Sequence, residues 1–252
     1  MNIRAFSVAV MAACLALGAC TPAEDPQAAA AAKAAARDQA AAEAAKLFEA
    51  EYAKHNWELA RAHGDVLIAQ HPGSQAAARI KPQYDEVKTK ADEARELRRT
   101  TGLWSYQTEL AKGGSQLSAA IYARQPIDVD GSGAKPVRLI FRDHPEWGRS
   151  SYLTLEAGDF NCYGGCRVKV KVDDDATKSM AASRPKTDEA IAMFIEDERA
   201  LWRLAKEAKV LAVEFPVKAG GTRTAVFEVG GLEPAKLPAW NCDLAPESRT
   251  PV

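Results

Sequence analysis

The stretch Cys166-Arg167-Val168-Lys169-Val170-Lys171-Val172 decides the fold class of the second half of this chain. Charged and valine side chains alternate strictly along it. Successive side chains of a strand point to opposite faces of a sheet, so this alternation predicts a strand with one buried and one solvated face. Further segments with a period of two begin at Gly102, and turn residues such as those of 130–133 separate them.

Seven short strands are expected from this patterning, at 103–106, 119–123, 137–142, 152–156, 167–172, 210–215 and 222–229. Pro216 cannot donate a hydrogen bond to a β-ladder, so the strand before it is expected to lie at an edge there. A helix is expected to interrupt the strands. Thr187 is its N-cap, and Asp188 and Glu189 suit the positive end of its dipole. Its apolar stripe consists of Ile191, Phe194, Ile195, Leu201, Trp202 and Ala205.

The preceding part of the chain, 41–100, has the apolar spacing of helices. One helix is expected to end before Lys54-His55-Asn56, a second to run from Trp57 to His71, and a third to run from about Gln75 to Thr100. Ser74 is a favourable N-cap for the third helix. The chain is therefore expected to be α+β. A helical hairpin or three-helix segment precedes a small antiparallel β-sandwich or barrel at 102–236 with one covering helix, and 237–252 forms an irregular tail.

Residues 44–72 resemble a single tetratricopeptide unit. Asn56 and Trp57 stand where that family has the polar and aromatic residues of its turn. Ala60 is the small residue of the second helix, and a proline follows it twelve residues later. Gly64 departs from the pattern, in which a large aromatic is usual, and His55 replaces the turn glycine. Because a repeat array needs about three units to be stable, a plain helical hairpin with a third helix is the alternative.

Residues 1–19 have the order of an export signal: a positive charge at Arg4, about a dozen apolar residues and a small-residue site. The apolar run is shorter than the roughly 20 residues that span a bilayer. Leu17-Gly18-Ala19-Cys20 resembles the lipobox of bacterial lipoproteins. The resemblance implies cleavage before Cys20, acyl chains on that cysteine and a tether at 20–40. An ordinary secretory signal with an unrelated cysteine is the alternative.

The resemblance to lipoproteins also implies a location in the cell envelope, lipid-anchored and facing the periplasm. Thr21 replaces the Asp that would suggest retention in the inner membrane of Gram-negative bacteria, so the outer membrane is favoured. No second apolar stretch approaches spanning length. The net charge is −1, and loss of Arg4 with the leader makes it −2. This balance gives no electrostatic reason to expect nucleic acid as a partner.

Four motifs of the second half resemble a loosely defined group of bacterial envelope proteins. They are Phe160-Asn161-Cys162, the strand from Cys166 to Asp173, Met193-Phe194-Ile195, and Val226-Phe227-Glu228-Val229-Gly230-Gly231-Leu232. The resemblance covers 102–236 and implies a fold and an envelope setting. It implies no catalytic residues.

The cysteines after Cys20 favour a structural disulfide between Cys162 and Cys166. An exported chain keeps disulfides, and Gly164 and Gly165 let the intervening turn close. Cys242 is either a free thiol or a rival partner for one of the two. The pair lacks the Cys-x-x-Cys spacing of redox-active sites. Zinc would need four ligands, and only three cysteines other than Cys20 remain, without a histidine pair at the usual spacing.

Other motifs that carry chemistry are lacking. His55, His63 and His71 lie eight residues apart, too far for a metal pair on one helical turn. The loop 128–133 lacks the third acidic ligand and the closing glutamate of a calcium loop. The sequence has no nucleophile motif of the Gly-x-Ser-x-Gly kind. We therefore expect no catalytic residue, no metal site and no cofactor.

Two functions of different classes follow. The first is a membrane-anchored, non-catalytic protein-interaction or structural module with an envelope protein as its partner, for which Trp57, Trp104 and Trp147 are contact candidates. The second is an envelope hydrolase or carbohydrate-binding module with a cleft in the β-rich domain. An enzyme should have converging side chains with shifted pKa values in a deep pocket, and an interaction module should have an apolar groove or patch.

Overall fold

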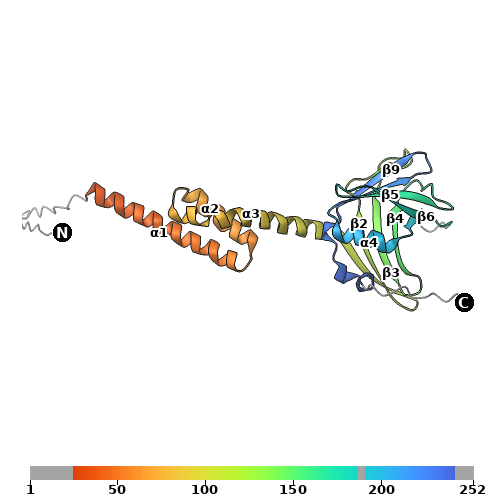
Figure 1. Ribbon diagram of the computed structural model, residues 1–252, viewed down its shortest axis with the longest axis horizontal. Coiled ribbons are helices and arrows are strands. Elements are labelled where there is room, and N and C mark those ends of the chain that lie inside the picture. Colours follow the sequence, from red (N-terminus) through yellow and green to blue (C-terminus); the bar gives the residue numbers. More distant parts are fainter. Residues whose placement is uncertain (1–24, 187–190, 242–252) are drawn as a thin grey trace, which may run out of the picture. The chain divides into compact units, whose positions relative to one another are not determined.

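The computed structural model describes residues 25–186 and 191–241 (Figure 1). The expected lipidation site Cys20, the leftover Cys242 and the expected N-cap Thr187 lie outside the described residues. The chain divides into two compact units, one up to residue 88 and the other from residue 89. Across the described ranges, no helix is both long enough and apolar enough to cross a membrane.

The first unit is helical. Its elements are α1 (Pro26–Ala53), α2 (Trp57–Gln70) and the beginning of α3 (Gln75–Thr101). The second and third helices begin and end within one residue of the expected positions. Ser74 caps α3 as expected, since its Oγ accepts a hydrogen bond from the Ala77 backbone N–H over 3.1 Å. The described part of α1 before Ala41 is fully exposed, and its high alanine content supplies helix propensity where packing supplies none.

Two departures from the tetratricopeptide pattern have a physical reason here. His55 adopts a φ of +57°, the left-handed conformation that glycine reaches at no steric cost. Gly64 lies against the rings of Tyr84 and Phe48, and a Cβ there would come within 2.5 Å of Tyr84. The ring of Tyr84 therefore occupies space that a large side chain at position 64 would need. Tyr84 also donates a hydrogen bond to Asp65.

The second unit contains nine antiparallel strands in one open sheet, so the chain is α+β as expected. The strand order is β1-β2-β3-β4-β7-β6-β5-β8-β9. The bounds are β1 (Trp104–Ala111), β2 (Gly114–Tyr122), β3 (Val137–His144), β4 (Gly148–Leu155), β5 (Cys166–Val172), β6 (Lys178–Ser183), β7 (Ile191–Ile195), β8 (Leu211–Pro216) and β9 (Thr222–Phe227). The strands of the described residues form one sheet that does not close, rather than the expected sandwich or barrel.

A single apolar core lies on one face of this sheet. Trp104 from one edge strand and Phe227 from the other belong to the same cluster of buried residues, so the sheet wraps around its core. Helix α4 (Glu198–Glu207) lies against this face (Figure 1) and contributes Leu201 and Trp202 to the cluster. Trp240, from the last of three short 3₁₀ turns (Val229–Gly231, Pro234–Lys236 and Pro238–Trp240), packs on Trp202 with ring centroids 5.1 Å apart.

The expected helix from Thr187 to Ala205 is wrong in its first part. Ile191, Phe194 and Ile195 belong to β7, which pairs with β4 and β6. Helix α4 begins only after Asp197, whose side chain accepts the N–H of Ala200 over 3.0 Å. A short apolar run does not distinguish a strand from a buried helix by its period. The pairing with β4 decides between them here, because it holds the run extended and places Met193 and Ile195 in the core.

The edge position expected for the strand before Pro216 is also wrong, because β8 lies between β5 and β9. Its pairing with β5 stops at Glu214, so Pro216 interrupts no ladder on that side. The sheet also contains a β1–β2 hairpin that extends to Ala111 and Gly114, and the whole of β6, which were not expected from the sequence.

Candidate functional site

A cleft of about 680 Å³ lies within the second unit, between the last turns of α3 and the sheet. It is lined by Asp92, Glu93, Glu96, Leu97, Thr100, Arg124, Lys209, Val210, Glu228 and Gly230. Leu97 is 57% exposed and presents an apolar side chain among these charged groups.

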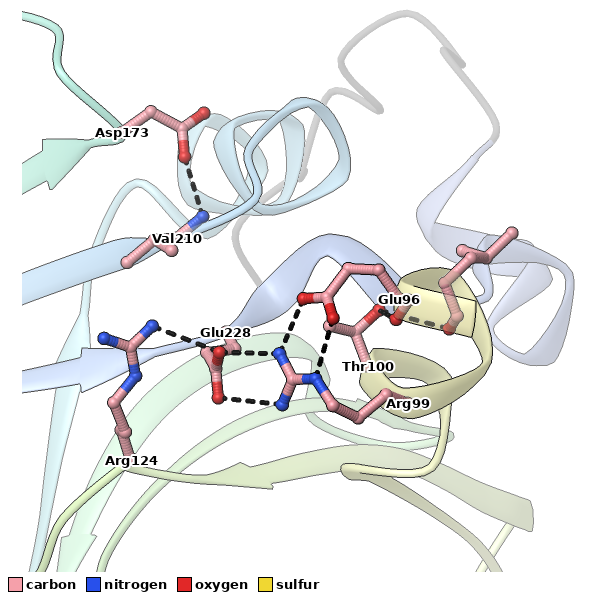
Figure 2. A network of polar contacts seen from close by, with 8 residues as sticks. Glu96, Arg99, Thr100, Arg124, Asp173, Val210 and Glu228 are labelled. Atoms are coloured by element: carbon pink, nitrogen blue, oxygen red, sulfur yellow. Dashed lines mark hydrogen bonds and ion pairs between the residues drawn. The ribbon is translucent and has the colours of Figure 1, made fainter. Parts of the chain in front are cut away.

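A network of ion pairs organises one side of the cleft (Figure 2). Arg99 donates to both carboxylate oxygens of Glu228 over 2.7 and 3.2 Å, and to both oxygens of Glu96 over 2.7 and 2.9 Å. Arg124 donates to Glu228 over 3.1 Å. Paired donors from one guanidinium fix the geometry of a carboxylate more firmly than a single contact does. The network therefore ties the end of α3 to the end of β9.

The fold brings these residues together from distant parts of the sequence. Arg99 lies in the last turn of α3, where the helix dipole favours a cation. The backbone N–H of Arg124, just after β2, donates to the carbonyl of Val226 in β9 over 2.7 Å. Close approach of α3 also depends on Gly231, where a Cβ would collide with the backbone of Thr100 and Thr101.

Asp173 holds another part of the lining in place, although it does not line the cleft itself (Figure 2). It follows β5 with a φ of +44°, and its carboxylate accepts the backbone N–H groups of Lys209 and Val210 over 3.1 and 2.8 Å. This places the backbone of 209–210, at the start of β8, on the lining. The cleft is thus bounded by groups whose positions are set by hydrogen bonds.

The ion pairs lower the pKa values of the two glutamates in the network and raise the pKa of the arginine between them. The pKa of Glu228 is lowered, chiefly by the hydrogen bonds from Arg99 and further by the hydrogen bond from Arg124. Together these hydrogen bonds outweigh burial, which raises the pKa. Hydrogen bonds from Arg99 likewise lower the pKa of Glu96, and the two carboxylates raise the pKa of Arg99. These groups are charged at neutral pH, whereas a general acid or base works best with a pKa near the working pH.

A second polar cluster surrounds the cysteine pair. Cys162 and Cys166 form a disulfide that joins the loop before β5 to the beginning of that strand. Beside it, the buried Arg184 donates to Asp159 over 2.8 Å, and the Tyr163 hydroxyl donates to the other oxygen of that carboxylate over 2.8 Å. This arrangement holds the disulfide loop against the end of β6.

Burial is the largest single influence on Asp159 and raises the pKa of its carboxyl. Hydrogen bonds from Arg184, Tyr163 and the backbone N–H of Phe160 together outweigh burial, so the pKa lies below its ordinary value. The cluster is therefore an ion pair at neutral pH.

The other candidates are dispersed. Trp104 is buried in the core, Trp57 packs on His55, and Trp147 is 67% exposed on the turn after β3. His144 is buried under Trp147, with ring centroids 3.9 Å apart, and its Nδ1 accepts two backbone N–H groups. In the ranges 25–186 and 191–241, no three His, Cys, Asp or Glu side chains form a group that could hold a metal.

The residues that form this cleft were not expected from the sequence. Its main partners, Arg99 and Glu228, are 129 residues apart and belong to no spacing motif. A weak signal is the Glu96 and Arg99 pair, three residues apart on a helix, which predicts only a surface contact.

No protein-family model and no curated protein matches the chain. Among solved structures, the chain is similar to invasion associated protein B from Bartonella henselae, with a TM-score of 0.34 and 16% sequence identity. The match covers 51% of this chain and 85% of that one.

Proposed function

We propose that this chain is a lipid-anchored protein of the cell envelope, favoured at the outer membrane, and that its β-rich unit acts by binding a partner protein rather than by catalysis. The cleft that contains Leu97 is the binding site. The observation that carries the proposal is that the cleft combines an exposed apolar side chain with carboxylates held as ion pairs.

The choice of binding over catalysis rests on the state of these carboxylates. Arginine pairing keeps Glu96 and Glu228 ionised at neutral pH and uses hydrogen-bonding sites on both oxygens of each. Such groups are poor proton donors and poor nucleophiles at that pH. Carboxylates that are held in ion pairs can instead form a rigid, charged rim around an apolar contact. Protein interfaces have this arrangement, with a polar rim around an apolar core. A short apolar segment of an envelope protein is the occupant we propose.

The anchor is tested by the variant Cys20→Ser. A thioether-linked diacylglycerol and an amide-linked acyl chain on one residue bury enough methylene groups to hold a protein on a membrane, at about 0.8 kcal/mol for each group. We expect the wild-type protein to sediment with membranes in detergent-free buffer and the variant to be released. Cys242→Ser is the matched control and should sediment like the wild type. Sedimentation of the Cys20→Ser variant with membranes would refute the anchor.

The cleft is tested by photo-crosslinking in cells. A photoreactive amino acid replaces Leu97, and the control carries it at Leu110, which is 94% exposed on β1 and does not line the cleft. We expect a discrete adduct with an envelope protein from position 97 and none of that mass from position 110. Adducts of equal mass and yield at both positions, or none at position 97, would exclude the cleft as the binding site.

A further inference from the structure

The face of the sheet turned away from the core, called here the outer face, is basic. Its residues alternate along each strand with the core residues. On the five adjacent strands β3, β4, β7, β6 and β5, this face carries five cations and no carboxylate: Arg138, Arg142, Arg167, Lys169 and Lys171. The chain as a whole has a net charge of −1. Glu109 on β1 and Glu214 on β8 lie on the same face but outside these five strands, so the positive charge is concentrated on the middle of the sheet. Such a concentration is the electrostatic condition for recognising a polyanion.

Two of these cations have unused hydrogen-bonding capacity. Arg138 and Arg142 make no ion pair with any carboxylate of the described ranges, whereas Lys169 pairs with Glu214 on β8 over 2.8 Å. A guanidinium has five N–H donors. Arg142 uses its Nε on the Ser150 hydroxyl over 3.2 Å. The Nε of Arg138 is buried without an acceptor among the described residues, so the protein leaves this side chain incompletely satisfied.

Aromatic rings hold both guanidinium groups in place. Arg138 lies over the ring of Tyr122 at 5.3 Å, and Arg142 lies over the rings of Tyr152 and Trp147 at 5.3 and 5.4 Å. Cation–π contacts of this kind restrict a long side chain without neutralising its charge. Anion binding then costs less side-chain entropy than it would for a freely moving arginine.

The spacing suits a polymer rather than one small anion. Arg138 and Arg142 are four residues apart on β3, which places their Cα atoms about 13 Å apart at about 3.3 Å per residue. Tyr152, opposite Ile140 in the register, lies between them. Lys171 continues the positive charge on β5, three strands beyond β4 in the sheet order. A ligand that contacts all three must carry several separated negative charges.

We propose that the outer face binds an acidic polysaccharide, with Arg138 and Arg142 as its principal anion contacts. Exposed rings of Tyr122 (53%) and Trp147 (67%), and the hydroxyls of Ser150 and Thr154, supply the apolar and polar contacts that sugars use. A lipid surface fits less well, because membrane-binding surfaces insert aliphatic side chains. Among the described residues of the outer face, no large aliphatic side chain is exposed. This surface is separate from the cleft, and the inference does not depend on the partner proposed there.

The test is a binding titration with polygalacturonate, using the chain without its first twenty residues. We expect saturable binding that weakens as salt increases, since exposed charges are screened. The double variant Arg138→Gln, Arg142→Gln should bind at least about tenfold more weakly, through loss of two charge-assisted contacts. The matched control, Arg199→Gln with Arg203→Gln on α4, removes the same charge from elsewhere and should change affinity by less than about twofold.

Neutral dextran and vesicles with a third phosphatidylglycerol are the other two probes. Binding to polygalacturonate alone, lost in the outer-face variant and kept in the control, supports the proposal. Equal weakening in both double variants, no binding to polygalacturonate, or binding to the vesicles in preference to it would overturn the proposal. Circular dichroism checks that each double variant is folded. If the outer-face double variant is not folded, the two single variants replace it. Each single variant is expected to lose about half of the binding free energy that the double variant would lose. These results leave the crosslinking test of the cleft unaffected.

Discussion

Cys162 and Cys166 form the disulfide that their spacing in the sequence favours. Two glycines in the intervening turn favour the link, and the structure places the Arg184–Asp159 ion pair beside it. A closed loop of five residues is expected to stabilise the fold by about 2 kcal/mol on the chain-entropy estimate. The double variant Cys162→Ser, Cys166→Ser should therefore unfold with a free energy about 2 kcal/mol lower in urea, and Cys242→Ser should unfold like the wild type.

Peptide mapping of the oxidised protein checks the pairing behind this prediction. The expected link joins Cys162 to Cys166 within one short peptide. A link from either residue to Cys242 would contradict the assignment, whatever the stability of the variants.

Asp159 makes the fold sensitive to acid. Its pKa in the folded protein is lowered, so it binds a proton less readily there than in the unfolded chain, where the pKa is about 3.9. Its stabilising contribution is complete above that value and is lost as the pH falls through the lower folded-state pKa. We expect Asp159→Asn to lose about 3 kcal/mol at pH 7, because it removes the carboxylate from the buried Arg184.

The measurement is the urea unfolding free energy at pH 7 and at steps below pH 4. The difference between wild type and Asp159→Asn should shrink as the pH falls below 4. A constant difference between pH 7 and pH 2.5 would show that the ion pair does not act through the charge of Asp159.

Among the elements, the junction of α3 with the 3₁₀ turn Val229–Gly231 depends on one glycine. A Cβ at Gly231 collides with the backbone of Thr100 and Thr101, which cannot move aside as a side chain can. The neighbouring Gly230 has its nearest contact, the Cα of Lys209, at 3.4 Å. Gly231→Ala should therefore destabilise the second unit by about 1–3 kcal/mol, the range for overpacking, and Gly230→Ala should be nearly neutral.

Thermal unfolding of the two variants measures this difference. Hydrogen exchange in 92–101 should also increase in Gly231→Ala, since the end of α3 loses its close contact. Equal melting temperatures for the two variants would mean that the junction is looser than the structure indicates.

Elements with strong local signals were predictable from the sequence, and those defined by pairing were not. The alternation of β5 and the Ser74 cap of α3 are local patterns, and both are confirmed. Strand β7 was assigned to a helix because five apolar residues have no distinguishing period. Its identity depends on β4, which lies 36 or more residues earlier.

The residues of the cleft were unpredictable for the same reason. Glu228, Arg124 and Arg99 are ordinary charged residues in sequence, and only the approach of β2, β9 and α3 makes them a network. The outer face is an intermediate case. The alternation in β5 predicts a solvated, basic face, but the sheet order is needed to place it on the same sheet face as Arg138 and Arg142 of β3.

At the scale of the whole molecule, the chain divides into two compact units, and the second carries both the cleft and the basic outer face. Attachment to a membrane would restrict the protein to the envelope. It would therefore raise the effective concentration of envelope ligands at the cleft and at the outer face. Weak contacts at the cleft and at the outer face would then suffice for stable association.

The mass of the N-terminal peptide tests the attachment to the membrane. Protein purified from membranes in detergent would be digested, and the peptide that begins at Cys20 would be analysed by mass spectrometry. We expect this peptide to begin at Cys20, without the first nineteen residues, and to carry a diacylglycerol group on Cys20. An N-terminal peptide with an unmodified Cys20, or one that retains any of residues 1–19, would contradict this expectation.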